Sequence, residues 1–424
     1  MKLYPHQIEA LELTKGKNKV AYYYDMGLGK TFIGSKKMEE IGFPVNLVIC
    51  QKSKVKDWID HFDDNYEATV DDLTTKRGLE HFLNSFGSFN KGQLIGVINY
   101  DLIFRRPDLL KLANFTLLLD ESSLITNKTA KRSKFALKLD AKNVILLSGT
   151  PTAGKYENLW SQLQLLGWSI SEDMFWKSYV EYDWIETEDG YWEKKIKGYK
   201  NIDHLKKRLY QHGAIFKKTE EVIDLPEKIE QMIYVDPSNE YKKFVKNSYV
   251  VVRDKELIGQ NVLTKILYER ELCGQYNQDK LDAFKDLIES TEDRLIVFYN
   301  YTEEMLRMTR ICMELKRPTS YVNGSIKDLS SYEDYDNSVT FVQYQAGAYG
   351  LNLQKANKMI YFTLPLGLGS CDLWEQSKKR IHRIGQDKTC FYYYLLVRDS
   401  IEIWNLELLK TGKELTDDLF KQRE

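Results

Sequence analysis

Residues 20–31 read VAYYYDMGLGKT, a short apolar run that leads into two glycines, a lysine and a threonine. The apolar run predicts a buried strand, and the pattern after the lysine predicts a helix. The glycines would let backbone N–H groups approach phosphates, the lysine would reach the β- and γ-phosphates, and the threonine would ligate Mg²⁺. The stretch therefore predicts a phosphate-binding loop made by Gly27, Gly29, Lys30 and Thr31.

A second stretch, Gly149–Lys155, matches the bare pattern GxxxxGK and also follows an apolar run. Tyr156 comes next, where a phosphate loop has Ser or Thr to ligate Mg²⁺. The first stretch lacks only the opening glycine, because Tyr24 occupies that position, and it keeps the residues that perform the chemistry. We therefore assign the phosphate loop to residues 25–31.

An acidic pair ends the apolar run FTLLLDE at residues 115–121. Asp120 would hold Mg²⁺ through water, and Glu121 would polarise the attacking water. Taken alone, the pair also fits a strand that ends in solvated carboxylates. Together with the phosphate loop, it predicts a nucleoside triphosphatase that uses Mg²⁺; the resemblance described below implies that the nucleotide is ATP.

Two series of short apolar runs, separated by helical patterns such as Thr31–Ile41 and Lys54–Phe62, predict two α/β lobes with buried parallel sheets. The first series is Val20–Tyr24, Val45–Cys50, Leu94–Ile98, Phe115–Leu119 and Val144–Leu147. The second is Leu295–Tyr299, Ser320–Val322, Val339–Val342, Met359–Phe362 and Phe391–Val397. Residues 151–290 between them have few strand patterns, and their periodicity predicts helices at Tyr241–Val252 and Thr264–Tyr276.

One segment of this middle stretch, residues 182–200, alternates apolar and charged residues around Asp189-Gly190, which is a hairpin turn signal. The pattern is compatible with an exposed hairpin insertion and with a plain surface loop.

The composition of the chain excludes several classes of protein. The chain has 424 residues, with 61 basic and 62 acidic ones and a net charge of −1. This length suits two or three domains, and this charge excludes a polybasic chain held on nucleic acid by bulk charge. The 5 cysteines lack CxxC spacing and the histidines lack a ligand pattern, so we expect neither a disulfide framework nor a histidine metal centre. No apolar run has the length of a membrane span, and we expect a cytoplasmic protein.

Four motifs occur in a fixed order: DMGLGKT, LLLDES, LSGTP at Leu147–Pro151 and RIHRIGQ at Arg380–Gln386. With them the sequence resembles the Swi/Snf branch of the superfamily 2 helicase-like ATPases, in a minimal form of bacterial or phage type. The resemblance implies an α/β protein of two RecA-like parallel-sheet lobes with a helical connection. Lobe one would span residues 1–225 with a helical and hairpin insertion at about 155–215, a helical connector would span 226–278, and lobe two would span 279–424.

The resemblance also implies the rest of the nucleotide site. Arg380 and Arg383 match the arginine fingers that stabilise charge on the γ-phosphate, and their spacing of three predicts a shared helical face. Further nucleotide-binding positions are Gln7, Gly350 and Gln376. Ser148, Gly149 and Thr150 match the motif that couples the two lobes, which accounts for the second GxxxxGK. Ser122 and Ser123 replace the usual alanine and histidine after the acidic pair, so coupling would run through Ser123 or be looser.

The positions implied to contact DNA are Lys52, Ser53, Asn99, Tyr100, Asn300 and Gln345. The function implied is an ATP-hydrolysing motor that translocates along double-stranded DNA, in nucleoprotein remodelling, replication or recombination. One alternative is a strand-separating helicase on forked or single-stranded DNA, with the 182–200 hairpin and its Trp184, Tyr191 and Trp192 as a pin. Another is a nucleotide-switched DNA clamp.

Overall fold

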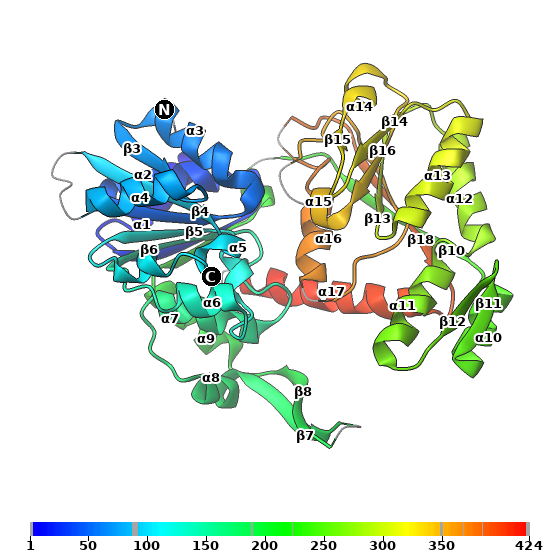
Figure 1. The fold of residues 1–424 in the computed structure, drawn as a ribbon, viewed down its shortest axis with the longest axis horizontal. Coiled ribbons are helices and arrows are strands. Elements are labelled where there is room, and N and C mark those ends of the chain that lie inside the picture. The colour runs from blue at the N-terminus through cyan, green and yellow to red at the C-terminus, as the bar shows by residue number, and fades with distance from the viewer. Residues whose placement is uncertain are drawn as a thin grey trace. The chain divides into compact units, whose positions relative to one another are not determined.

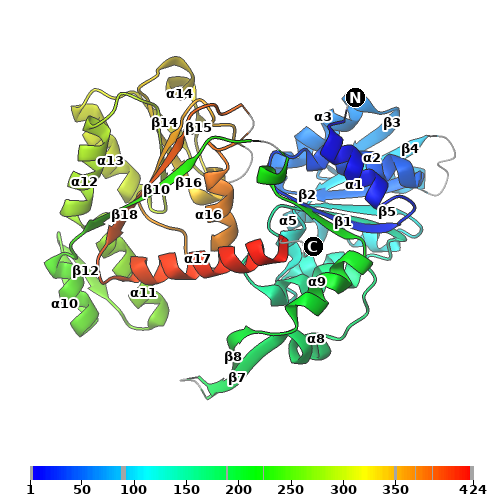
Figure 2. The ribbon, with the colours of Figure 1, turned by 180° about the vertical axis from the view of Figure 1, so that it is seen from behind.

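The computed structural model divides the chain into two compact units (Figures 1 and 2). Unit 1 comprises Met1–Val222 and Glu414–Glu424, and unit 2 comprises Ile223–Lys413. The structure describes residues 3–86, 92–187, 190–222, 224–347, 351–367, 369–383 and 385–420.

Unit 1 is built on a 7-stranded sheet with the order β3-β4-β2-β5-β6-β1-β9, in which every pair of neighbours is parallel. Strands β2 and β6 are buried at every residue, so the sheet is covered on both faces, as the continuous apolar runs predict. The strands are β1 (Lys19–Tyr24), β2 (Val45–Cys50), β3 (Ala68–Asp72), β4 (Gln93–Asn99), β5 (Thr116–Asp120), β6 (Asn143–Ser148) and β9 (Ala214–Lys217). All the predicted strands of the first series are thereby confirmed.

The helices of unit 1 supply that cover (Figure 1). They are α1 (Pro5–Leu13), α2 (Lys30–Ile41), α3 (Val55–Asn65), α4 (Lys76–Phe86), α5 (Tyr100–Ile103), α6 (Lys131–Ala136), α7 (Trp160–Leu165), α8 (Glu172–Tyr179) and α9 (Ile202–Gln211). Both helices predicted in this region are present, as α2 and α3. In α3 the buried residues Val55, Trp58 and Phe62 recur at helical spacing on the side that packs on the sheet.

The segment around residues 182–200 is a two-stranded antiparallel hairpin. The predicted hairpin is therefore confirmed, and the alternative prediction of a plain surface loop is wrong. Its strands are β7 (Val180–Glu186) and β8 (Trp192–Tyr199), and Figure 1 shows it projecting from the end of α8. Gly190 at the turn has a φ of 78°, a conformation that glycine adopts without steric cost. Asp189 lies outside the described residues.

Unit 2 is built on a second 7-stranded sheet with the order β10-β18-β17-β13-β16-β14-β15. Neighbouring strands are parallel except β15, which is antiparallel to β14. Alternate residues of β13 enter different apolar clusters, since Ile296 and Phe298 join one and Val297 and Tyr299 the other, so this sheet too is covered on both faces. The strands are β10 (Lys228–Val235), β13 (Leu295–Tyr299), β14 (Thr319–Val322), β15 (Lys327–Asp328), β16 (Val339–Gln343), β17 (Lys358–Tyr361) and β18 (Cys390–Val397).

The described helices of unit 2 are α10 (Asn239–Asn247), α11 (Val262–Cys273), α12 (Gln278–Glu289), α13 (Thr302–Glu314), α14 (Ser330–Asp334), α15 (Tyr344–Gly347), α16 (Ser370–Lys378) and most of α17 (Ile401–Phe420). Residues of α17 up to Lys413 belong to unit 2, and those from Glu414 belong to unit 1. Within the described ranges no helix is both long and apolar enough to cross a membrane.

The middle stretch contains more strands than its sequence predicts. Strand β9 joins the first sheet, β10 joins the second, and β11 (Tyr249–Val252) pairs with β12 (Lys255–Ile258) in a separate hairpin. The helix predicted over Tyr241–Val252 is therefore wrong in its second half. Helix α10 ends because Ser248 takes a left-handed φ of 54°, and the β-branched Val250–Val252 continues as a strand. The residues predicted as a connector, 226–278, lie within unit 2.

Gly213 provides a test of how tightly β9 is tied to β1. A Cβ at this position would lie 2.4 Å from the backbone oxygen of Lys19, and its φ is 83°. Gly16 has a similar φ of 71° but open space around it. We expect Gly16→Ala to lower the free energy of unfolding by about 1–2 kcal/mol and Gly213→Ala by about 2–5 kcal/mol, because only the second adds a clash to the strained backbone. Urea unfolding measures the stability of both variants. Equal losses of stability would show that the backbone at Lys19 shifts to accept the added Cβ at little cost.

Candidate functional site

The phosphate loop connects β1 to α2 in the geometry that its glycines allow. Gly27 and Gly29 have left-handed φ values of 86° and 72°, and Gly29 caps the N-terminus of α2. A Cβ on Gly29 would lie 2.1 Å from the Nε2 of Gln7, so a larger residue would strain the backbone and displace the Gln7 side chain. Gln7 is buried, donates to the carbonyl of Leu28 at 3.2 Å and accepts the N–H of Tyr4 at 2.9 Å. A helix N-terminus that follows a glycine loop is an arrangement that can bind an anion.

Lys30 lies over the loop in this structure. Its Nζ donates to the carbonyls of Tyr24 at 2.7 Å and of Asp25 at 3.2 Å. The same Nζ lies 3.5 Å from the position that a Cβ on Gly149 would take, which places the lysine between the ends of β1 and β6. The loop is also anchored on its other side, because Asp25 accepts the backbone N–H of Thr219, which follows β9, at 3.2 Å.

The acidic pair lies at the end of β5, two strands from β1. Asp120 accepts the indole N–H of Trp58 at 2.8 Å. Burial raises the pKa of the Asp120 carboxyl, while the hydrogen bond from Trp58 and the charge of Lys30 oppose this rise. Glu121 has a left-handed φ of 58°, which is uncommon for a residue other than glycine and typical of functional sites.

Two serines hold the Glu121 carboxylate. Ser148, at the end of β6, donates to its Oε1 at 2.7 Å, and Ser123 donates to the same oxygen at 3.1 Å. The Ser148 hydroxyl also accepts the N–H of Thr150 at 3.1 Å. Glu121 is thus bonded directly to the predicted coupling residue Ser148, and through Ser148 it is linked to Thr150.

A buried glutamine extends this network. Gln162 on α7 accepts the hydroxyls of Ser122 at 2.8 Å and Tyr23 at 3.0 Å, and it donates to the carbonyl of Pro151 at 2.7 Å. One side chain therefore ties together β1, the acidic pair and the segment after β6. Sequence reasoning missed Gln162 and Trp58, because nothing in the local pattern links either to the site.

Four of the residues predicted to contact DNA lie at the same carboxyl edge of the first sheet, where the neighbouring strands β2 and β4 end. The register pairs Cys50 of β2 with Asn99 of β4, so the residues that follow them are close. Lys52 and Ser53 are exposed, whereas Asn99 and Tyr100 are buried. The Tyr100 hydroxyl donates to the backbone oxygen of Asp120 at 3.0 Å, so this side chain supports the acidic pair.

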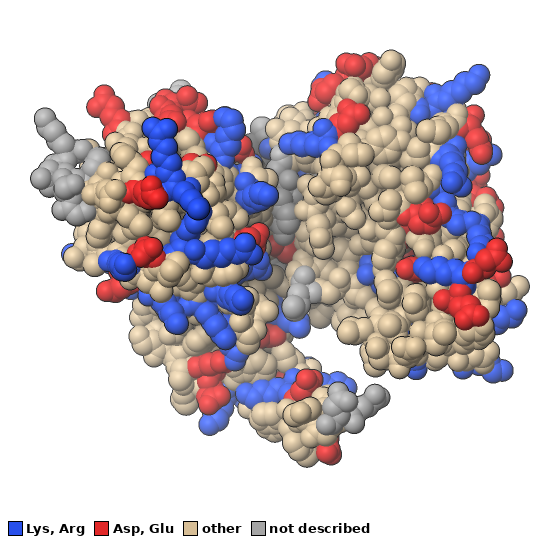
Figure 3. Space-filling view, in the orientation of Figure 1, with Lys and Arg blue, Asp and Glu red and all other residues tan. Residues whose placement is uncertain are grey.

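Figure 3 shows basic side chains over the part of unit 1 where α5 and α6 lie. The two helices contact each other, and exposed basic residues surround them. These are Arg105, Lys128, Lys131, Lys134 and Lys138, which we call the α6 basic cluster. Sequence reasoning missed this cluster, although the run NKTAKRSKFALK at residues 127–138 carries a visible signal in its lysine spacing.

The two predicted arginine fingers are in unit 2, but the shared helical face is wrong. Helix α16 ends at Lys378, and both arginines lie in the turns that follow. They converge instead on the carbonyl of Leu351, to which Arg380 donates at 3.1 Å and Arg383 at 3.4 Å. Arg383 also donates to the Asn352 side chain. Arg380 is only 2% exposed, and Arg383 is the more accessible of the two.

The other predicted positions of unit 2 differ in accessibility. Gln376 is buried on α16, and its Oε1 has no hydrogen-bond partner among the residues that the structure describes. Gly350 lies outside the described residues, and Gln345 is exposed on α15, the short helix that follows β16. The side-chain amide of Asn300 is hydrogen-bonded within unit 2, where its Nδ2 donates to the Thr363 hydroxyl at 2.9 Å and to the carbonyl of Leu364 at 3.0 Å.

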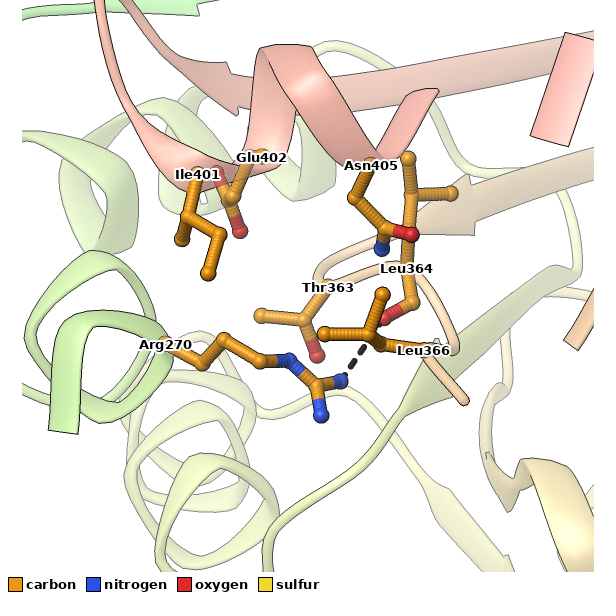
Figure 4. Close-up of a pocket in the computed structure, with 7 residues that line it drawn as sticks. All are labelled: Arg270, Thr363, Leu364, Leu366, Ile401, Glu402 and Asn405. Atoms are coloured by element: carbon orange, nitrogen blue, oxygen red, sulfur yellow. Dashed lines mark hydrogen bonds between the residues drawn. The ribbon is translucent and has the colours of Figure 1, made fainter. Parts of the chain in front are cut away.

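Figure 4 shows a small pocket that is lined in part by Thr363, Leu364 and Leu366, the segment that Asn300 contacts. Arg270 of α11 donates to the carbonyl of Leu364 at 2.9 Å, and Asn405 of α17 donates to that of Pro365 at 3.0 Å. Asn300, Arg270 and Asn405 therefore fix the chain between β17 and α16, the helix that precedes the arginines. The pocket is part of this support.

The donor set fits Mg²⁺. Thr31 supplies a hydroxyl in the first turn of α2, and Asp120 supplies a carboxylate whose Oδ2 is oriented by Trp58. Both are hard oxygen ligands of the kind that Mg²⁺ binds beside phosphates, where it would neutralise phosphate charge. No cluster of three His, Cys, Asp or Glu side chains that would make an all-protein metal site occurs in the part of the chain that the structure describes.

The sequence profile of the family described as the SNF2-related domain matches residues 15–279, more than half of the chain. The chain belongs to the SNF2-related family. This agrees with the Swi/Snf resemblance of its motifs and with the two parallel-sheet units.

Individual relatives are distant. The chain is 25% identical to the SWI/SNF-related matrix-associated actin-dependent regulator of chromatin subfamily A-like protein 1 of Xenopus tropicalis, over 89% of this chain and 40% of that protein. It is 22% identical to the DNA annealing helicase and endonuclease ZRANB3 of Homo sapiens, over 100% of this chain and 41% of that protein. The chain thus spans about two fifths of the length of either relative. A solved structure of the Sulfolobus solfataricus SWI2/SNF2 ATPase core in complex with dsDNA is 20% identical, with a TM-score of 0.45 over 99% of this chain and 93% of that one.

The serine pair on Glu121 yields a prediction for this SNF2-related chain. Ser148→Ala removes the shorter hydrogen bond to the carboxylate and an acceptor for Thr150, so we expect kcat for ATP hydrolysis to fall roughly 10- to 100-fold with little change in KM. Ser123→Ala is the matched control and should cost less, because its bond is longer. Steady-state kinetics decides, and a larger loss for Ser123→Ala would transfer the orienting role to Ser123.

Proposed function

We propose that the chain is an ATP-hydrolysing motor that translocates along double-stranded DNA. The observation that supports this best is the arrangement along one edge of the first sheet. The ends of β1, β5 and β6 carry Lys30, Glu121 and Ser148, while Lys52 follows β2, the next strand along. Because β2 pairs directly with β5, a change at the phosphates and a grip on DNA would act on one rigid sheet.

Each part of the nucleotide site has a physical role in this proposal. Lys30 exchanges its backbone carbonyl partners for the β- and γ-phosphates when ATP enters the loop. Glu121, oriented by Ser148, orients and polarises the attacking water. Arg383, the more accessible arginine of unit 2, supplies positive charge to the γ-phosphate, and Arg380 holds the chain at Leu351 that Arg383 also contacts.

The DNA grip would be electrostatic and independent of sequence, because a motor must move over any bases. Lys52 and the α6 basic cluster are exposed on unit 1, and apart from Lys128, which is paired with Glu172, they would provide this charge although the whole chain is nearly neutral. The relative from Homo sapiens carries DNA and helicase in its name, which agrees with DNA as the partner.

Two alternatives remain distinct in experiment. A strand-separating helicase is favoured by the exposed aromatic side chains of the β7–β8 hairpin and would open forks only while that hairpin is present. A nucleotide-switched clamp would bind DNA in the ATP state without steady turnover. Triplex displacement detects translocation on a duplex, and fork unwinding detects strand separation.

Hydrolysis is tested by two substitutions that fail for different reasons. Lys30→Ala should weaken ATP binding and abolish turnover, because the phosphates lose a positive charge. Glu121→Gln should keep ATP binding and abolish turnover, because the water is no longer polarised. ATPase assays on duplex, forked and single-stranded DNA, with nucleotide binding measured alongside, separate the two. Near-normal turnover of Glu121→Gln would remove Glu121 from the catalytic role, and turnover without duplex stimulation would contradict the motor.

Salt dependence tests the DNA edge. Duplex affinity should fall with salt with a log–log slope of about −0.9 per phosphate contacted, and Lys52→Gln should reduce that slope by about one. Lys15→Gln is the control, because Lys15 is exposed and precedes β1 at the opposite edge of the sheet. Fluorescence anisotropy at several salt concentrations measures both, and an unchanged slope for Lys52→Gln would remove Lys52 from the DNA contact.

A further inference from the structure

The β7–β8 hairpin has two chemically different faces. Directly opposite residues of an antiparallel pair share a face, and alternate residues along a strand lie on opposite faces. One face contains the pairs Tyr182–Ile196, Trp184–Lys194 and Glu186–Trp192. The other contains Asp183–Lys195 and Ile185–Glu193. We call the first the aromatic face.

Aromatic rings continue along this face from the body of unit 1 toward the turn. Trp176 of α8 lies 5.5 Å from Tyr182, and Tyr182 lies 6.1 Å from Trp184, measured between ring centroids. Trp184 is 56% exposed, and Trp192 nearer the turn is 63% exposed. An apolar ring that leaves more than half of its surface in water is available to a partner.

A lysine lies in the middle of these rings. The Nζ of Lys194 is 4.6 Å from the ring centroid of Tyr182, 4.7 Å from that of Trp176 and 5.5 Å from that of Trp184. Among the described residues Lys194 has no ion pair, whereas Lys197 bonds Asp183 on the other face at 2.5 Å. The aromatic face therefore combines exposed rings with a lysine that forms no ion pair among the described residues, and Glu186 is the one acidic residue in its strand pairs.

We propose that the aromatic face binds unpaired DNA bases, so that the substrate of this motor is DNA with a single-stranded branch. Every base has a π-face, so stacking on Trp184 and Trp192 would tolerate any sequence, and Lys194 would attract the phosphates between the bases. A duplex keeps its bases stacked on one another and offers no free π-face except at its ends. The proposal rests on the proposed action on DNA and adds the form of DNA that is recognised.

The test compares binding of three probes by the full chain. They are a labelled oligodeoxythymidine of about 16 nucleotides, a blunt duplex, and a fork with two unpaired arms. Trp184→Ala and Trp192→Ala should each weaken binding of the oligonucleotide and the fork roughly 5- to 150-fold, because each removes a stacking ring. Binding of the blunt duplex and duplex-stimulated ATPase should not change.

The matched control is Trp404→Ala, since Trp404 is 51% exposed on α17 in unit 2 and should leave all three probes unaffected. Trp184→Phe keeps a ring and should restore most of the binding, which separates stacking from a folding defect. Equal binding of the oligonucleotide by the original chain and by both alanine variants would overturn the proposal and leave the aromatic face to a protein partner. If duplex does not stimulate the ATPase of the original chain, the proposed motor function is contradicted. The proposal for the aromatic face is still tested in that case, because oligonucleotide binding is measured without ATP.

Discussion

Parallel pairing of every strand in the first sheet is the constraint on which the site depends. Because all seven strands run in one direction, every loop that follows a strand opens at the same edge. The phosphate loop, the acidic pair, the coupling serine and Lys52 are far apart in sequence and still meet there. Strands β2 and β6 are buried on both faces, and closely packed strands transmit strain. A small shift at the end of one strand would therefore displace the end of its neighbour.

At that edge, hydrogen bonds link the acidic pair to the residues that follow β5 and β6. Ser148 and Ser123 bond one oxygen of Glu121, and Gln162 joins β1, Ser122 and Pro151. The two serines that replace the usual alanine and histidine therefore both form hydrogen bonds in this network. Serine hydroxyls are uncharged donors, so they position the Glu121 carboxylate without placing a further charge beside the acidic pair.

Much of this was predictable from sequence, because strands buried on both faces read as continuous apolar runs and the phosphate loop has a defined chemistry. All ten predicted strands and the β7–β8 hairpin are present. Tertiary contacts were not predictable: Trp58 reaches Asp120 from α3, and Tyr100 turns inward to the same residue. The spacing of Arg380 and Arg383 suggested a helix, but α16 ends at Lys378 and the arginines are arranged by the Leu351 carbonyl.

The contrast between these arginines bears on how unit 2 acts. Arg380 is 2% exposed and bonds a backbone carbonyl, whereas Arg383 is half-buried and burial lowers its pKa, so an anion beside Arg383 would stabilise its charged form. Asn300, Arg270 and Asn405 hold the segment before α16 in the same way, through backbone carbonyls. Backbone carbonyls do not titrate, so these bonds do not depend on the protonation of an acceptor. The chain around Arg383 in unit 2 is thus fixed through acceptors whose charge does not change with pH.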